Sequence, residues 1–251
     1  MSGHSHWATI RRKKGAADAK RGQVFTRLAR EIVIAAREGG GDPDSNVRLA
    51  LAIDRARSQN MPKENIERAI KRGTGDSKDG VTLEEITYEG YAPHGVAVLV
   101  SVVTDNRNRT VAEIRHMLSR AGGTMSEAGS VAWQFKRVAF FGFEQGEHDS
   151  DSIFELAVEA GADDVSFDDN WVEIVGPVDS FKSISDALKK AHITPEEAEL
   201  RYVANNETEL DDTQTIQVYK VIESLEELDD IQSVYSTLAM SESAMAQLEE
   251  A

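Results

Sequence analysis

Apolar positions in the first 75 residues recur every three or four residues, the spacing of one face of a helix. They predict a first helix over 16–38, ended by three consecutive glycines. A second helix is expected from about Asn46, with Ser45 or Asp44 as its cap, and a third over 62–73, with proline at its first position. The chain therefore begins with an all-helical domain.

A polar, glycine-rich stretch at 72–80 has no apolar residue to bury and is typical of a linker. The pattern after it is of the β type. Strands are expected at 84–91, 95–104 and 129–136, with a helix at 109–123 between the second and the third. This part of the chain is a β-β-α-β unit.

The elements expected next follow the order β-α-β-β-α-β, which is that of a ferredoxin-like domain. A helix capped by Asp211 or Asp212 and a strand at 231–238 come after it and are too short to fold alone. Because the β-β-α-β unit lacks such an α-β piece, we infer that the ferredoxin-like domain is inserted in the middle one.

The predicted fold class is α+β, a helical N-terminal domain followed by two α/β domains, with the third domain inserted in the second. The predicted domains are a basic helical domain at 1–75, a middle α/β domain at 81–136 plus 206–240, an inserted ferredoxin-like domain at 137–205, and a frayed tail at 241–251.

Charge divides the chain in two. The first 75 residues contain 16 Lys and Arg against 8 Asp and Glu, a net charge of +8, so the remainder holds 28−16 = 12 basic and 44−8 = 36 acidic residues, a net charge of −24. Charges are screened beyond about 10 Å at ordinary salt, so each domain meets its partner largely alone. Because carboxylates repel phosphate, we expect nucleic acid to contact the chain before Gly75.

The basic residues of this first domain are the main functional signal. Their alternative explanation is a set of solvated helix faces, which accounts for most short charge runs. Binding is favoured because the basic excess persists over three helices and begins in a segment with too few apolar residues to form a core. The residues expected to bind nucleic acid are His4, His6, Trp7, Arg11, Arg12, Lys13, Lys14, Lys20, Arg21, Arg27, Arg30, Lys71 and Arg72.

The opening "GHSHW" has more than one interpretation. Trp7 either stacks on an unpaired base, with the histidines touching phosphate, or packs on the helical domain. If Met1 is removed, the start Ser2-Gly3-His4 has the donors to hold Cu(II) or Ni(II) in a square plane. We regard that as incidental, and expect neither a metal nor any other cofactor.

Two further motifs are weaker. The second and third helices are spaced as in a helix-turn-helix, although any three-helix bundle needs such a turn. The loop "TDNRNRT" at 104–110 places Arg107 and Arg109 over a helix start, a candidate secondary anion contact. The alternative is a cap by Asn108 or by neighbours of Arg109, together with a structural pair between arginine and a carboxylate.

Catalysis is not supported, because the sequence has no P-loop, Rossmann fingerprint, HExxH motif or nucleophile elbow. We therefore expect no enzyme and no catalytic residues. Cysteine is absent, which excludes a disulfide framework, and no stretch approaches the roughly 18 apolar residues of a membrane span. A cytoplasmic protein without a membrane partner is expected.

Several long blocks resemble the YebC/PmpR family. They are "GHSHWATIRRKKGAADAKRGQVFTRLAREI", "GGGDPDSNVRLALAIDRARSQNMPKENIERAIKRG", "YEGYAPHGVAVLVSVVTDNRNRTVAEIRH", "GSVAWQF" and "LEELDDIQSVYS". The resemblance runs to about residue 238. It implies a three-domain, non-catalytic regulator of gene expression in the cytoplasm.

The resemblance also implies two modes of action. Family members are mostly described as probable transcriptional regulators that bind DNA, whereas mitochondrial relatives are translational activators of cytochrome c oxidase. Some bacterial members act on ribosomes, contacting ribosomal RNA or tRNA and relieving stalls at proline-rich sequences. We expect a DNA-binding transcriptional regulator, with a ribosome-associated translation factor as the alternative. No dimerising heptad is evident, so a monomer is expected.

Overall fold

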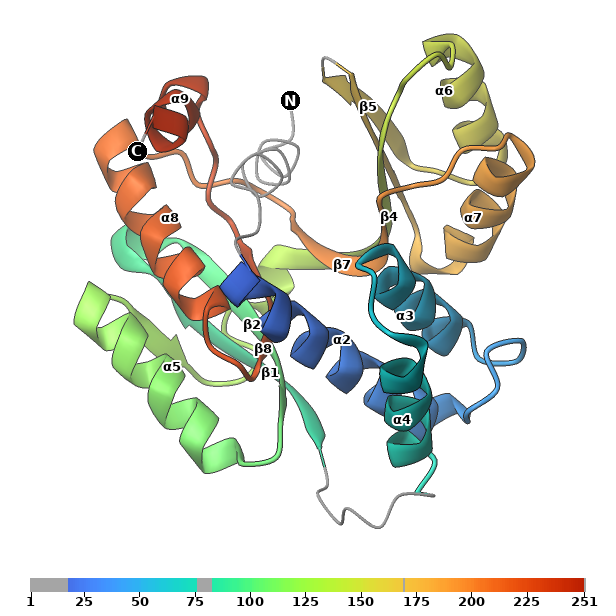
Figure 1. Cartoon of the computed structure of the whole chain (residues 1–251). Coiled ribbons are helices and arrows are strands. Elements are labelled where there is room, and N and C mark those ends of the chain that lie inside the picture. The colour runs from blue at the N-terminus through green and yellow to red at the C-terminus, as the bar shows by residue number, and fades with distance from the viewer. Residues whose placement is uncertain (1–17, 76–82, 169, 251) are drawn as a thin grey trace. The chain divides into compact units, whose positions relative to one another are not determined.

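The computed structural model describes residues 18–75, 83–168 and 170–250, and it divides into two compact units (Figure 1). The smaller unit is Phe135–Val203, and the larger comprises the described residues on either side of it. The chain thus leaves the larger unit and later returns to it, in agreement with the predicted fold class. The boundary expected at 75–81, within the larger unit, stays a prediction.

Three helices begin the larger unit: α2 (Asp18–Gly39), α3 (Val47–Ser58) and α4 (Lys63–Gly73). Gly73 lets α4 approach α2, because a Cβ there would lie 2.5 Å from the Val33 carbonyl oxygen. The cap of α3 is Asn46 itself and not Ser45 or Asp44. Its side-chain oxygen accepts from the Leu49 N–H at 3.1 Å, and its amide donates to two carbonyls at the end of α2 at 2.8 Å each.

An antiparallel sheet with the strand order β3-β1-β2-β8 forms the rest of the larger unit. Its strands are β1 (Glu84–Tyr91), β2 (Ala97–Thr104), β3 (Thr124–Ser126) and β8 (Ile231–Ser236). Two helices, α5 (Arg107–Ala121) and α8 (Asp212–Glu226), pack together on one face (Figure 1). β8 pairs with β2, so the inferred completion of the sheet by the later α-β piece is confirmed.

The strand expected over 129–136 is wrong in its first part. Residues 129–131 are not a strand, and Ala132–Gln134 is a short 3-10 helix. The cause is the buried carboxylate of Glu89, which accepts from the N–H groups of Gly129, Val131 and Ala132 at 2.6, 2.7 and 2.9 Å. Burial alone would raise the pKa of Glu89, but these bonds lower it below its ordinary value.

The chain enters and leaves the smaller unit through two segments that are hydrogen-bonded to each other, which we call the neck. The backbone N–H of Asn205 donates to the Gln134 carbonyl at 2.8 Å. The Asn205 side-chain amide donates to the Trp133 carbonyl at 3.0 Å. Both bonds lie in the larger unit and bring together residues about 70 positions apart.

The smaller unit contains β4 (Phe135–Glu144), α6 (Ser150–Glu159), β5 (Asp164–Asp168), β6 (Trp171–Gly176), α7 (Phe181–Lys190) and β7 (Glu197–Ala204). The sheet order is β5-β6-β4-β7, which with this connectivity is the predicted ferredoxin-like arrangement. Both helices cover one face (Figure 1), where the rings of Phe141 and Phe181 are 4.7 Å apart between centroids.

The tail expected to fray instead forms α9 (Glu242–Glu250), so that prediction is wrong. Met240, Ala244 and Leu248 are spaced four apart and are all buried, and Met240 and Leu248 belong to the core that includes α8. The carboxylate of Asp212 accepts from the hydroxyls of Ser241 and Ser243 at 2.7 and 2.8 Å. The helix is therefore attached at both ends.

Candidate nucleic-acid interface

Part of the predicted binding surface lies outside the described residues, namely His4, His6, Trp7, Arg11, Arg12, Lys13 and Lys14. Lys20 and Arg21 belong to the beginning of α2, and Arg27 is half-buried on the same helix. Residues 1–17 contain four cations and no carboxylate, so they supply +4 of the +8 charge of the first 75 residues. Half of the basic excess thus precedes α2.

Several other cations of the helical region are paired within the protein. Arg30 contacts Asp230 at 3.0 Å, and Arg48 contacts Glu38 and Glu85 at 2.6 and 2.8 Å. On α3, Arg55 pairs with Glu31 and Arg57 with Asp54, at 3.2 and 3.3 Å. These contacts neutralise arginines that the sequence counts toward the basic excess of the first 75 residues.

The second half of α4 differs from the rest of the helical region. Arg68, Lys71 and Arg72 are spaced three and four apart, so they share one side of the helix. Arg68 and Lys71 are exposed, and none of the three forms an ion pair with another described residue. The Nε of Arg72 also lacks a hydrogen-bond partner in the described structure. We call these three residues the α4 cation face.

The position of the α4 cation face argues against the reading of bases by a helix-turn-helix. In such motifs the N-terminal residues of the second helix contact base edges. The first turn of α4 instead carries Glu64, and Lys63 is 3.7 Å from Glu67. The unpaired cations stand at the carboxyl end, where they suit contact with backbone phosphates, which carry no sequence information.

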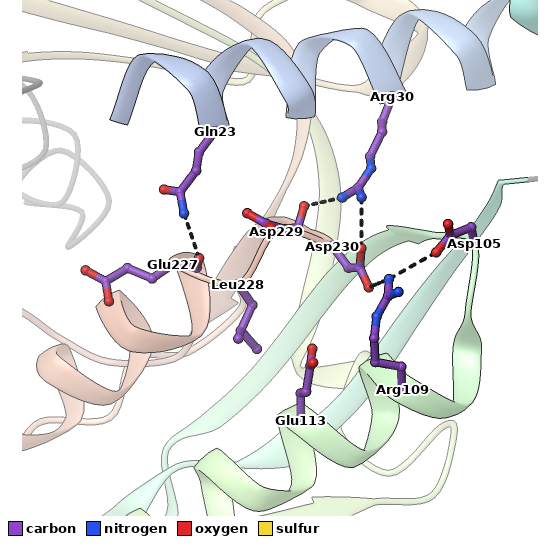
Figure 2. A pocket seen from close by; sticks show the side chains of 9 residues that line it. All are labelled: Gln23, Arg30, Asp105, Arg109, Glu113, Glu227, Leu228, Asp229 and Asp230. Carbon is purple, nitrogen blue, oxygen red and sulfur yellow. Dashed lines mark hydrogen bonds and ion pairs between the residues drawn. The ribbon is translucent and has the colours of Figure 1, made fainter. Parts of the chain in front are cut away.

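Arg109 belongs to a carboxylate cluster (Figure 2). Its guanidinium lies 2.7 Å from Asp230 and 3.0 Å from Asp105, and its backbone N–H donates to the helix cap Asn106. The structural pair considered above is therefore present, with Asn106 as the cap instead of Asn108. Arg107 is exposed, and an anion contact there stays a prediction.

Asp230 is the centre of this cluster and was not among the predicted site residues. Only 3% of its side chain is exposed. It accepts from the hydroxyls of Thr104 and Thr110 at 3.0 and 2.6 Å, besides its pairs with Arg30 and Arg109. Because Arg30 comes from α2, Asp230 joins the helical region to the sheet (Figure 2).

A cleft of about 530 Å³ lies beside this cluster. It is lined by Gln23, Arg30, Asp105, Arg109, Glu113, Glu227, Leu228, Asp229 and Asp230. Five carboxylates thus face two arginines, which disfavours a phosphate ligand. Two sequence signals point to the cluster: the acidic "LEELDD" segment before β8 and the pair between arginine and a carboxylate expected in "TDNRNRT".

The described residues contain no group of three or more His, Asp or Glu side chains arranged to hold a metal ion. None of the helices in this part of the chain has the length and apolar character needed to cross a membrane.

Known proteins resemble the chain over nearly its whole length. Residues 5–76 match the family model "TACO1/YebC protein N-terminal domain", and residues 83–238 match "TACO1/YebC second and third domain". A protein of Chlorobaculum tepidum named a probable transcriptional regulatory protein is 49% identical over 251 residues, 100% of both chains. A protein of Geotalea uraniireducens with the same name is 49% identical over 245 residues, 98% of both.

A crystal structure of a conserved hypothetical protein from Aquifex aeolicus has the same fold. Its TM-score is 0.83 at 39% sequence identity, covering 90% of this chain and 93% of that one. The names of the curated relatives describe regulatory proteins and not enzymes. Both family models together span most of the sequence, and the chain therefore belongs to the TACO1/YebC family.

Proposed function

We propose that this protein is a non-enzymatic regulator of gene expression that binds nucleic acid through its basic helical region. Contact with phosphate is made by residues 11–14, by the cations at the start of α2 and by the α4 cation face. The names of the curated relatives support the regulatory role, and DNA is the partner that those names favour.

One observation carries the proposal. The α4 cation face holds three cations that are not paired with another described residue, whereas Arg30, Arg48, Arg55 and Arg57 all have carboxylate partners. An uncompensated cation attracts phosphate and releases the counterions bound to it, and this drives binding. A paired arginine must first leave its carboxylate.

Neutralising the α4 cation face in the R68Q/K71Q/R72Q variant should weaken the binding of duplex DNA by about tenfold at ordinary salt. The slope of log affinity against log salt should become shallower by roughly 0.9 for each phosphate that the variant no longer neutralises. Fluorescence anisotropy with labelled DNA at several salt concentrations measures both quantities.

The matched pair for this experiment is Arg68→Gln and Arg57→Gln. Both remove one exposed arginine from the helical region, but Arg57 is already paired with Asp54. We expect the first to reduce affinity more than the second. Equal effects would mean that only net charge matters and that α4 holds no particular surface.

Neutralising residues 11–14 in the variant R11Q/R12Q/K13Q/K14Q should weaken binding by at least as much as neutralising the α4 cation face, because it removes four cations that have no carboxylate within residues 1–17. The same anisotropy titration measures this. Unchanged affinity would restrict the interface to α2 and α4. A variant with both sets neutralised that still binds at wild-type strength would contradict the proposal as a whole.

A second candidate is a translation factor that contacts ribosomal RNA. It is favoured by the place of the α4 cations at the carboxyl end of the helix, which gives little choice of sequence on duplex DNA. Cosedimentation with ribosomal particles through sucrose at low salt tests it. Recovery with ribosomes, combined with equal affinity for promoter and scrambled DNA, would favour the translation factor over the transcriptional regulator.

A further inference from the structure

The smaller unit exposes three large apolar side chains: Phe154, Val158 and Phe167, with exposed fractions of 51%, 50% and 37%. Phe154 and Val158 are one helical turn apart on α6, whose Ile153 and Ala157 point into the core. The helix is therefore apolar on two sides, only one of which the fold buries. We call these three residues the α6 patch.

Phe167 belongs to the same side of the unit as α6. It lies opposite Val172 in the pairing of β5 with β6, so both side chains point to one face of the sheet. Gly176 lies four residues after Val172 on β6 and therefore belongs to the same face of the sheet. A Cβ at Gly176 would contact Ile184 of α7 and the residues that follow α6, so this is the face that the helices cover. β5 is an edge strand, so Phe167 lies at the edge of the face that the helices cover.

The stretch of sequence that contains the α6 patch carries only one sign of charge, although the neighbouring helix α7 carries the exposed Lys182, Lys189 and Lys190. Between Val138 and Phe181 the sequence has twelve Asp and Glu and no Lys or Arg. Asp151, Glu155 and Glu159 are exposed on α6 itself, and none forms an ion pair with another described residue. Carboxylates outnumber these lysines, so an incoming molecule meets exposed apolar side chains on a surface with an excess of negative charge.

We propose that the α6 patch is the docking surface for a separate protein that presents lysine or arginine around apolar side chains. Nucleic acid and anionic lipid are repelled by the carboxylates around it. A second copy of the same face is repelled for the same reason. A cationic segment with apolar side chains fits the α6 patch, because its charges pair with the surrounding carboxylates and its apolar side chains cover the exposed ones of the patch.

Two synthetic peptides test this, with equal length and equal lysine content, one with leucine and the other with serine at its remaining positions. The full-length protein should bind the leucine peptide about tenfold more tightly than the serine peptide in fluorescence anisotropy at ordinary salt, because apolar anchors contribute most of the energy at such sites. The variant F154S/V158S should bind both peptides equally.

The matched control is Trp133→Ser, which removes the other large exposed apolar side chain of the described chain, 70% exposed and located in the larger unit. It should leave the preference for the leucine peptide intact. Because Phe154 and Val158 are half exposed, their replacement by serine should leave thermal unfolding nearly unchanged, and this checks that the variant is folded.

The preference for the leucine peptide must also be independent of the binding of nucleic acid. F154S/V158S should bind DNA as the wild type does, and R68Q/K71Q/R72Q should keep the peptide preference, so failure of either function is visible separately. Loss of the preference in Trp133→Ser, or its survival in F154S/V158S, would overturn the proposal. So would concentration-dependent self-association in sedimentation velocity that F154S/V158S abolishes, since the occupant would then be a second copy of this chain.

Discussion

The replacement of Asp230 by alanine is expected to lower the free energy of unfolding of the larger unit by about 3 to 5 kcal/mol, the usual cost of removing one partner from a buried ion pair. The alanine leaves Arg30 without its carboxylate and takes away the shared acceptor of the hydroxyls of Thr104 and Thr110. Hydrogen exchange of the β2 and β8 amides measures the effect, because these strands carry the core of the larger unit.

Asp105→Asn is the matched control for Asp230→Ala. Asp105 contacts Arg109 at 3.0 Å, but 42% of its side chain is exposed, so its loss should cost less than about 1 kcal/mol. Similar protection in Asp230→Ala and Asp105→Asn would show that the buried cluster does not hold the helical region to the sheet.

The cost of losing Asp230 should also depend on pH. Burial alone would raise the pKa of Asp230, but the bonds from Arg109, Thr110 and Thr104 and the charge of Arg30 lower it below its ordinary value of 3.8. A carboxylate whose pKa is lower in the folded than in the unfolded protein stabilises the fold at pH values above its unfolded pKa. This stabilisation is lost as the pH falls through the folded pKa. The difference in the free energy of unfolding between the wild type and Asp230→Ala should therefore be largest at neutral pH and decrease below about pH 4.

Replacing Glu173 with glutamine should stabilise the smaller unit at pH 8. Glu173 lies on β6 with 3% of its surface exposed, and burial raises its pKa from 4.5 to about 7. The charge of Arg201 and a hydrogen bond from the Trp171 indole, at 3.2 Å, oppose that rise, whereas Glu197 and Asp168 add to it. At pH 8 the fold must hold this carboxylate in its charged form.

The sign of the effect follows from linkage. A carboxyl group with a raised folded pKa contributes stability that is complete below pH 4.5 and is lost as the pH rises through 7. The wild type should thus lose stability between pH 5 and pH 8, by an amount on the order of 3 kcal/mol at most. Urea unfolding followed through the NMR signal of the Trp171 indole measures it.

Glutamine keeps an acceptor for the Trp171 indole without the charge, so the pH dependence should largely vanish in Glu173→Gln. Glu144→Gln is the control, because Glu144 is an exposed carboxylate at the end of the neighbouring strand β4. Glu144→Gln should leave the dependence of stability on pH unchanged. A wild type equally stable at pH 5 and pH 8 would contradict the role of Glu173.

The regular elements were predictable because their side chains repeat with the period of the element. β1 has the bounds expected from its run of alternating residues, 84–91. The inserted order was also predictable, since an isolated α-β piece cannot bury its own apolar face. For the regular elements the information is local in the sequence.

The failures concern contacts between distant residues. The loop at 129–131 has a β-type sequence, but Glu89, about 40 residues away, binds its backbone N–H groups. A frayed tail is expected from the sequence because its apolar periodicity is weak and no partner for it is evident, although Met240 and Leu248 belong to the core beside α8. Arg30 looked like a residue that binds phosphate, and only the fold reveals its carboxylate partner.

The neck formed by Gln134 and Asn205 makes the smaller unit separable from the larger one. Its backbone atoms are 2.8 Å apart, so a short turn in place of the whole ferredoxin-like unit would close the larger unit without moving its strands. All four strands of the sheet β3-β1-β2-β8 lie outside residues 135–203, so the larger unit would keep a closed fold if that segment were replaced by a turn.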